Sequence, residues 1–112
     1  MARKKLKAPQ SEYRSPDGDV LVLRGSMTVG TRREYADTLG GSPLSQEDAW
    51  HRGVEFLFER LAVSWAVAGT EPLTRQKELL TRFRMASQDE RQWIRDVLRE
   101  HLAEHFPDLQ AP

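Results

Sequence analysis

Three segments of the chain share the pattern of a helix N-terminus, and this pattern constrains the fold more than any other feature. A Ser or Thr precedes an acidic residue by three positions in Thr31–Glu34, Ser45–Asp48 and Ser87–Glu90. Such a hydroxyl can accept a hydrogen bond from the backbone N–H three residues on, while the acidic side chain bonds back to the first residue. The three capping boxes therefore predict helices that begin beside residues 31, 45 and 87.

Apolar spacing extends these three starts into helices and predicts one more helix between the last two, four in all. We expect them at about 32–39, 46–68, 75–85 and 88–105. The second carries a wide apolar stripe that runs from Trp50 to Trp65, so it should be covered on more than one side. Gly40, Gly69 and Phe106-Pro107 are expected to end the first, second and fourth helices.

A β-hairpin is predicted ahead of the helices. Ser15-Pro-Asp-Gly18 suits a tight turn, because Pro presets φ and Gly accepts a positive φ. Residues 11–14 and 19–24 flank it as strands, and Val20–Leu23 is apolar on both faces, so we expect both faces to be covered. The fold class predicted is α+β and predominantly helical, with an N-terminal hairpin packed on about four helices.

Composition limits the classes of protein that remain. The chain has no cysteine, which excludes disulfides, thiol nucleophiles and thiolate metal sites. It lacks an apolar run of ~18 residues and a secretory signal pattern, so we expect a cytoplasmic protein without a membrane partner. Residues 1–10 are expected to form a flexible basic arm that contains Arg3, Lys4, Lys5 and Lys7, residues 11–107 one globular domain, and residues 108–112 a C-terminal tail.

The net charge of zero hides an uneven distribution. Residues 1–33 carry a balance of +5, residues 34–66 of −4 and residues 67–112 of −1. Such asymmetry indicates either a partner-facing surface, head-to-tail self-association, or a basic tail on an ordinary solvated domain.

Motifs for catalysis are weak. His101-Leu-Ala-Glu-His105 matches the H-x-x-E-H zinc-peptidase pattern but lacks a third ligand at motif spacing, so we interpret it as a helix C-terminus. Glu55 and Glu59 lie one helical turn apart. This spacing suits either acid–base catalysis or a solvent-exposed row of charged side chains, and we favour the exposed row. Gly25–Gly30 lacks the Lys of a phosphate loop and indicates a strand exit. We therefore expect no enzyme activity, no cofactor and no metal site.

A resemblance suggests a function. The run Phe56-Leu-Phe-Glu-Arg-Leu-Ala-Val-Ser-Trp65, followed by Gly69-Thr-Glu-Pro-Leu-Thr74, resembles tail assembly chaperones, small tail-module proteins of long-tailed actinobacterial phages and prophages. The likeness spans roughly residues 20–102. It implies a mostly helical, non-enzymatic adaptor that keeps the tape-measure protein soluble and helps to recruit tail-tube subunits. It also implies that Val63, Trp65 and Pro72, the positions that match the family, have a packing role.

Four aromatic residues are candidates for contact with a partner. They are Trp50, Phe56, Trp65 and Trp93. Trp is enriched at binding hot spots, although a Trp on a helical stripe is more often part of the core. A tape-measure segment or another tail protein is the expected partner, and a homo-oligomer is compatible with the sequence. The alternatives are a regulatory or nucleic-acid-associated adaptor that uses the basic arm, and a structural connector subunit of a virion.

Overall fold

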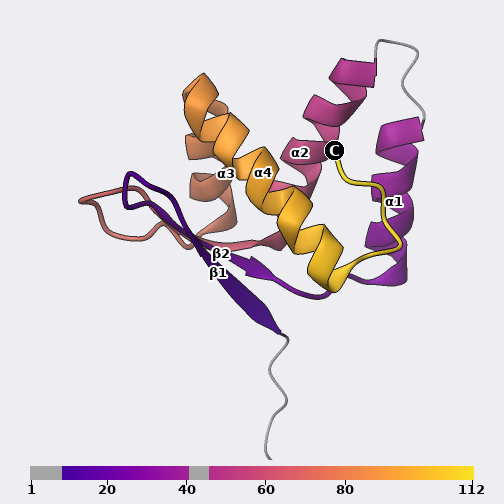
Figure 1. Cartoon of the computed structure of the whole chain (residues 1–112), viewed down its shortest axis with the longest axis horizontal. Coiled ribbons are helices and arrows are strands. Elements are labelled where there is room, and N and C mark those ends of the chain that lie inside the picture. Colours follow the sequence, from indigo (N-terminus) through magenta and orange to yellow (C-terminus); the bar gives the residue numbers. More distant parts are fainter. Residues whose placement is uncertain (1–8, 41–45) are drawn as a thin grey trace, which may run out of the picture.

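The computed structural model describes residues 9–40 and 46–112, and it has the α+β class that the sequence predicts (Figure 1). In chain order, the elements are β1 (Gln10–Arg14), β2 (Val20–Arg24), α1 (Val29–Gly40), α2 (Gln46–Leu61), β3 (Ala62–Ala66), α3 (Gln76–Arg84) and α4 (Gln88–His105). The basic arm residues Arg3, Lys4, Lys5 and Lys7, and the expected cap Ser45, lie outside the described residues. No helix among the described residues is both long and apolar enough to cross a membrane.

The predicted hairpin is confirmed. β1 and β2 pair antiparallel with Tyr13 opposite Leu21, and Ser15 N–H donates to the Asp19 carbonyl at 2.9 Å to close the turn. Gly18 has a φ of +93°, a conformation that a residue with a Cβ rarely adopts. The turn chemistry of the sequence therefore sets the register of this pair.

The second helix is shorter than predicted, since α2 ends at Leu61 and the chain continues as a strand, β3. β3 is antiparallel to β2, with Trp65 opposite Leu21, and completes a sheet of order β1-β2-β3. Trp65 also exchanges two backbone hydrogen bonds with Leu73, at 3.0 and 2.9 Å. The β-branched and aromatic side chains Val63 and Trp65 suit a strand, and pairing with β2 stabilises the strand over continued helix.

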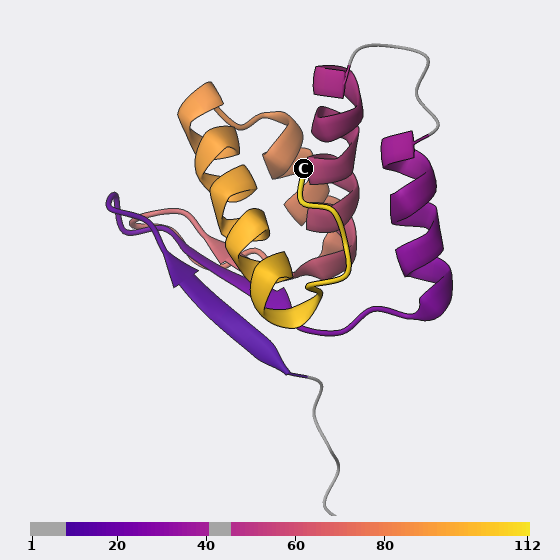
Figure 2. The same ribbon diagram turned by 45° about the vertical axis from the view of Figure 1, so that its right-hand side comes forward.

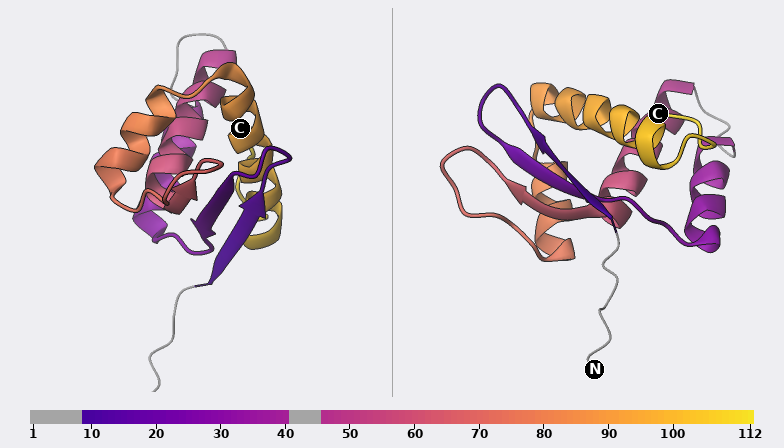
Figure 3. Two further views of the ribbon diagram at one scale, coloured as in Figure 1. Left: turned by 90° about the vertical axis from the view of Figure 1, so that its left-hand side faces the viewer. Right: turned by 60° about the horizontal axis from the view of Figure 1, so that its bottom comes forward.

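α2, α3 and α4 lie on one face of the sheet, and α1 packs against α2 on the side away from the strands (Figures 2 and 3). Leu21 and Leu23 of β2 face this side and are fully buried, whereas Val20 and Val22 on the opposite face are half-buried. In the described part of the chain, β2 is therefore fully covered on the helix side and only partly covered on the opposite face. The core gathers buried side chains from every element except β1: Leu21, Leu23, Tyr35, Val54, Leu57, Phe58, Leu61, Ala62, Trp65, Leu79, Phe83, Ile94, Val97, Leu98 and Leu102, joined by Phe106 after α4.

One capping box is confirmed, and one is displaced. Ser87 Oγ accepts from Glu90 N–H at 3.1 Å, and Glu90 accepts from Ser87 N–H at 2.9 Å, so α4 begins as predicted. α1 instead begins at Val29, because Thr28 Oγ1 accepts from Thr31 N–H at 3.1 Å. The prediction of Thr31 as the cap is wrong by one turn, since Thr28 also offers a hydroxyl at the right spacing.

The segment after α4 is packed against the helices. The Tyr35 hydroxyl donates to the Gln110 carbonyl at 2.5 Å, and Leu109 and Ala111 contact the core. Arg95 Nε donates to the Pro112 carbonyl oxygen at 3.2 Å. Residues 108–112, expected as a tail, thus link α4 to α1, and Pro112 lies close to Gly53 in the middle of α2.

Candidate functional site

The four candidate aromatics do not form one surface. Trp65 is fully buried, with its ring 5.6 Å from that of Phe58, so a partner of the folded domain does not contact it. Phe56 is half-buried, and its ring centroid lies 6.1 Å from that of Tyr35 on the α1 side of α2. Trp93 is half-buried and packs on the core. Trp50 adjoins a cleft, because its ring lies under Arg95, a residue that lines the cleft.

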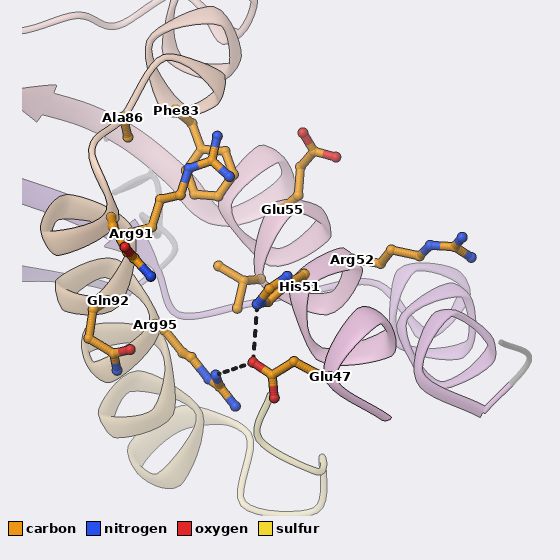
Figure 4. Close-up of a pocket in the computed structure, with 11 residues that line it drawn as sticks. Glu47, His51, Arg52, Glu55, Phe83, Ala86, Arg91, Gln92 and Arg95 are labelled. Atoms are coloured by element: carbon orange, nitrogen blue, oxygen red, sulfur yellow. Dashed lines mark ion pairs between the residues drawn. The ribbon is translucent and has the colours of Figure 1, made fainter. Parts of the chain in front are cut away.

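This cleft lies between α2 and α4, and we refer to it as the α2–α4 cleft (Figure 4). Its volume is about 590 Å³ and its mouth is open. α2 contributes one wall, α4 the other, and the α3–α4 connection closes one end. The lining residues are Glu47, His51, Arg52, Val54, Glu55, Phe83, Ala86, Gln88, Arg91, Gln92 and Arg95.

The floor of the cleft is apolar. Val54 and Phe83 are each 5% exposed and belong to the core, and Ala86 packs against them from the α3–α4 connection. Met85, which immediately precedes Ala86, is 75% exposed. A single exposed apolar side chain is common on protein surfaces, so the apolar floor of the cleft, more than Met85, marks this region as a candidate interaction surface.

Charged groups of both signs form the rim. Glu47 lies 3.1 Å from His51 Nε2 and 3.5 Å from Arg95 Nη1, so it bridges the two walls (Figure 4). The Arg95 guanidinium stacks on the Trp50 ring, with its Cζ 5.0 Å from the ring centroid. These contacts hold Arg95 in place, with only 17% of its side chain exposed.

A second set of charges stabilises the other end of the cleft. Glu55 accepts from Arg84 Nε at 2.9 Å, which ties α2 to the end of α3. Arg91 donates to the Arg84 carbonyl at 2.8 Å, and its Cζ lies 5.5 Å from the Phe83 ring centroid. Arg52 has no ion pair or hydrogen bond within the residues that the structure describes, so it remains available to a bound group.

The two histidines of the H-x-x-E-H pattern lie within hydrogen-bond distance of the hairpin. His101 is fully buried; its Nδ1 lies 2.8 Å from the Tyr13 hydroxyl and its Nε2 2.7 Å from the Arg24 carbonyl oxygen. His105 Nε2 lies 2.9 Å from Ser11 Oγ. Both nitrogens of His101 are thus hydrogen-bonded to protein groups, so neither is available to a metal. Within residues 9–40 and 46–112 no group of three or more potential ligands gathers for a metal ion.

The remaining sequence motifs also have structural roles in the fold. Glu55 pairs with Arg84, while Glu59 lies 3.6 Å from Arg60, so the two carboxylates point to different cations. The Gly25–Gly30 segment leads from β2 into α1, as the interpretation of a strand exit requires. Gly25 permits a close approach, since a Cβ there would lie 2.8 Å from His105 Nδ1.

Comparisons with known protein families, with curated proteins and with solved structures found no match. The choice of the α2–α4 cleft as the candidate site therefore rests only on the geometry described above. Of the positions that carry the resemblance to tail assembly chaperones, Trp65 has the packing role expected, Val63 is half-buried, and Pro72 is exposed, so the expectation is wrong for Pro72.

The α2–α4 cleft was not predicted. A sequence signal for it exists in α4, where Gln88, Arg91, Gln92 and Arg95 recur at helical spacing and form one polar face. The signal is ambiguous, because such a face is more often plain solvent-exposed surface. Only the packing of α4 across α2 turns it into the wall of a cleft.

Proposed function

We propose that this protein is a non-enzymatic interaction module that binds a helical segment of a partner protein in the α2–α4 cleft. The observation that carries the proposal is an open cleft with an apolar floor, and the exposed Met85, next in sequence to the lining residue Ala86, adds a further apolar group. Recognition of an amphipathic helix in a groove uses this arrangement, since the apolar face of the helix enters the groove and its polar face meets the rim.

The rim favours a partner of mixed charge. Glu47 and Glu55 on the α2 wall face Arg91 and Arg95 on the α4 wall, so the cleft has no single sign. A strongly acidic or basic segment would meet repulsion from one wall, whereas a helix with both charges can complement both. Arg52 adds one cation that a carboxylate of the partner can pair with.

We further propose that the partner is a segment of a tape-measure protein and that this chain is a phage or prophage tail assembly chaperone, active in the cytoplasm of the host cell. Its support is the sequence resemblance around residues 56–74 together with the cleft. A tape-measure protein is long and helical, and a chaperone that covers its apolar stripe would keep it soluble before assembly.

Co-expression tests this function. Fragments of the tape-measure protein from the same tail module are produced with the wild-type chain and with Met85→Glu, and the soluble fraction is measured. We expect the wild type to raise solubility several-fold and Met85→Glu to lose most of that gain, because a carboxylate beside the cleft opposes burial of an apolar face.

Val29→Glu is the matched control. Val29 is the other large apolar side chain that is strongly exposed in the described part of the chain, at 67%, and it lies at the start of α1, outside the cleft lining. We expect this variant to behave as the wild type. Equal loss with both variants, or no gain in solubility with the wild type, would contradict the proposal.

A further inference from the structure

The outer edge of β1 is open. β1 is the outermost strand in the views of Figures 2 and 3, and in the part of the chain that the structure describes no strand pairs with its outer edge. Backbone hydrogen bonds from Ser15 N–H to the Asp19 carbonyl and from Gly25 N–H to the Pro9 carbonyl show which opposed residues bond to each other. They are residues 9, 11, 13 and 15 with their partners on β2 and its flanks. Because such pairs alternate along an antiparallel ladder, the N–H and C=O groups of Glu12 and Arg14 point away from β2.

This edge has only part of the protection that natural sheets use. The segment Gln10–Arg14 is short and carries two charges, but it has no Lys, Pro or bulge, its register against β2 is regular, and its two charges are opposite in sign. Pro9 and Pro16 stand on either side of it and limit any added pairing to this short segment. Its Glu12 and Arg14 side chains are 50% and 72% exposed and pair with each other at 3.0 Å.

The charges of this edge are self-complementary about Tyr13. In an antiparallel pair of two β1 strands centred on Tyr13, each Glu12 lies directly opposite Arg14 of the second copy. The outward backbone groups of these residues then form four hydrogen bonds across the two-fold axis. A register centred on Glu12 would instead place two carboxylates opposite each other, which is unfavourable.

We propose that two copies of this chain associate through their β1 strands in the Tyr13-centred register and form a continuous six-stranded sheet. A two-fold contact of this kind is closed, so it gives a dimer and no longer polymer. The proposal is independent of the function proposed above, because the α2–α4 cleft contains no residue of β1. Each copy keeps its cleft, so the dimer would present two partner sites.

Charge exchange tests the dimer. Sedimentation velocity is measured from about 5 to about 500 µM protein for the wild type, Glu12→Arg, Arg14→Glu and the double exchange Glu12→Arg/Arg14→Glu. We expect dimer formation by the wild type, at least a ~10-fold weaker association for each single variant, and recovery in the double variant, which restores opposite charges across the axis.

Arg33→Glu serves as the control, since Arg33 is exposed on α1 and the substitution changes the net charge as Arg14→Glu does. It should dimerise as the wild type. A wild type that stays monomeric at every concentration, single variants that dimerise normally, or a double variant no better than the single ones would each overturn the proposal.

Cross-linking tests the register. The chain has no cysteine, so Glu12→Cys and Arg14→Cys each introduce a single thiol. An oxidised equimolar mixture should form mainly the mixed disulfide between positions 12 and 14, since opposed residues in a ladder lie within disulfide reach. A predominance of disulfides between two copies of Glu12→Cys would overturn the Tyr13-centred register.

Discussion

At the scale of single residues, His101 shows how a polar side chain can hold a small fold together. The Arg24 carbonyl can only accept, so the facing Nε2 of His101 carries the proton, and Nδ1 of the neutral ring accepts from the Tyr13 hydroxyl. One buried side chain thereby joins α4 to both strands of the hairpin. A core made of apolar contacts alone would not fix this docking so specifically.

His101 should also make stability depend on pH. Burial lowers the pKa of its imidazole below the ordinary value of 6.5, and the nearby His105 lowers it further, while the Arg24 carbonyl and Glu104 oppose the shift. Because the pKa is lower in the folded state, the contribution of His101 is present above about pH 6.5 and is lost as the pH falls toward the folded-state pKa.

His101→Gln tests this dependence, since an amide N–H can still donate to the Arg24 carbonyl but does not titrate. We expect the variant to be less stable than the wild type by about 1–3 kcal/mol near neutral pH, because the Tyr13 bond is lost. This difference should narrow as the pH is lowered to about 5. Urea unfolding across that range measures it, and a difference that stays constant with pH would contradict the account.

At the scale of elements, local signals in the sequence were sufficient to predict the bounds of a helix where the signals agreed with each other. The Ser87 capping box and the Phe106-Pro107 stop placed α4 correctly, because cap and stop chemistry act within a few residues. The end of α2 was predicted wrongly, since the apolar spacing of Trp65 with Leu61 fits a helix as well as a strand. Pairing with β2, more than 40 positions earlier in the chain, decides the outcome.

The capping box of α4 should make a measurable contribution to the stability of the fold. Glu90 accepts from the Ser87 backbone and pairs with Arg82 at 2.5 Å; although burial raises its pKa, these bonds outweigh burial and leave the pKa lowered. We expect Ser87→Ala to reduce the free energy of unfolding by about 1 kcal/mol. Ser26→Ala, at an exposed serine outside the helices, should change it by less than about 0.5 kcal/mol. Equal effects of both substitutions in urea unfolding would argue against a stabilising cap.

At the scale of the whole molecule, the uneven charge along the sequence acquires a structural role. Glu47 and Glu55 from the acidic middle segment pair with Arg95 and Arg84 from the last segment. Part of the asymmetry therefore serves to join α2 to α3 and α4. The sequence predicts the fold class, but the cleft depends on how helices about 40 residues apart cross, and no local pattern encodes that crossing.

The central claim, that a partner segment binds between α2 and α4, is tested most directly by NMR. Backbone amide shifts of ¹⁵N-labelled protein are followed while a tape-measure fragment is added. The account predicts saturable shifts concentrated in residues 47–55 and 83–95, which contain the cleft lining, with little change in α1. Binding whose shifts are confined to α1 or the sheet, or no binding by any fragment of the tape-measure protein, would contradict it.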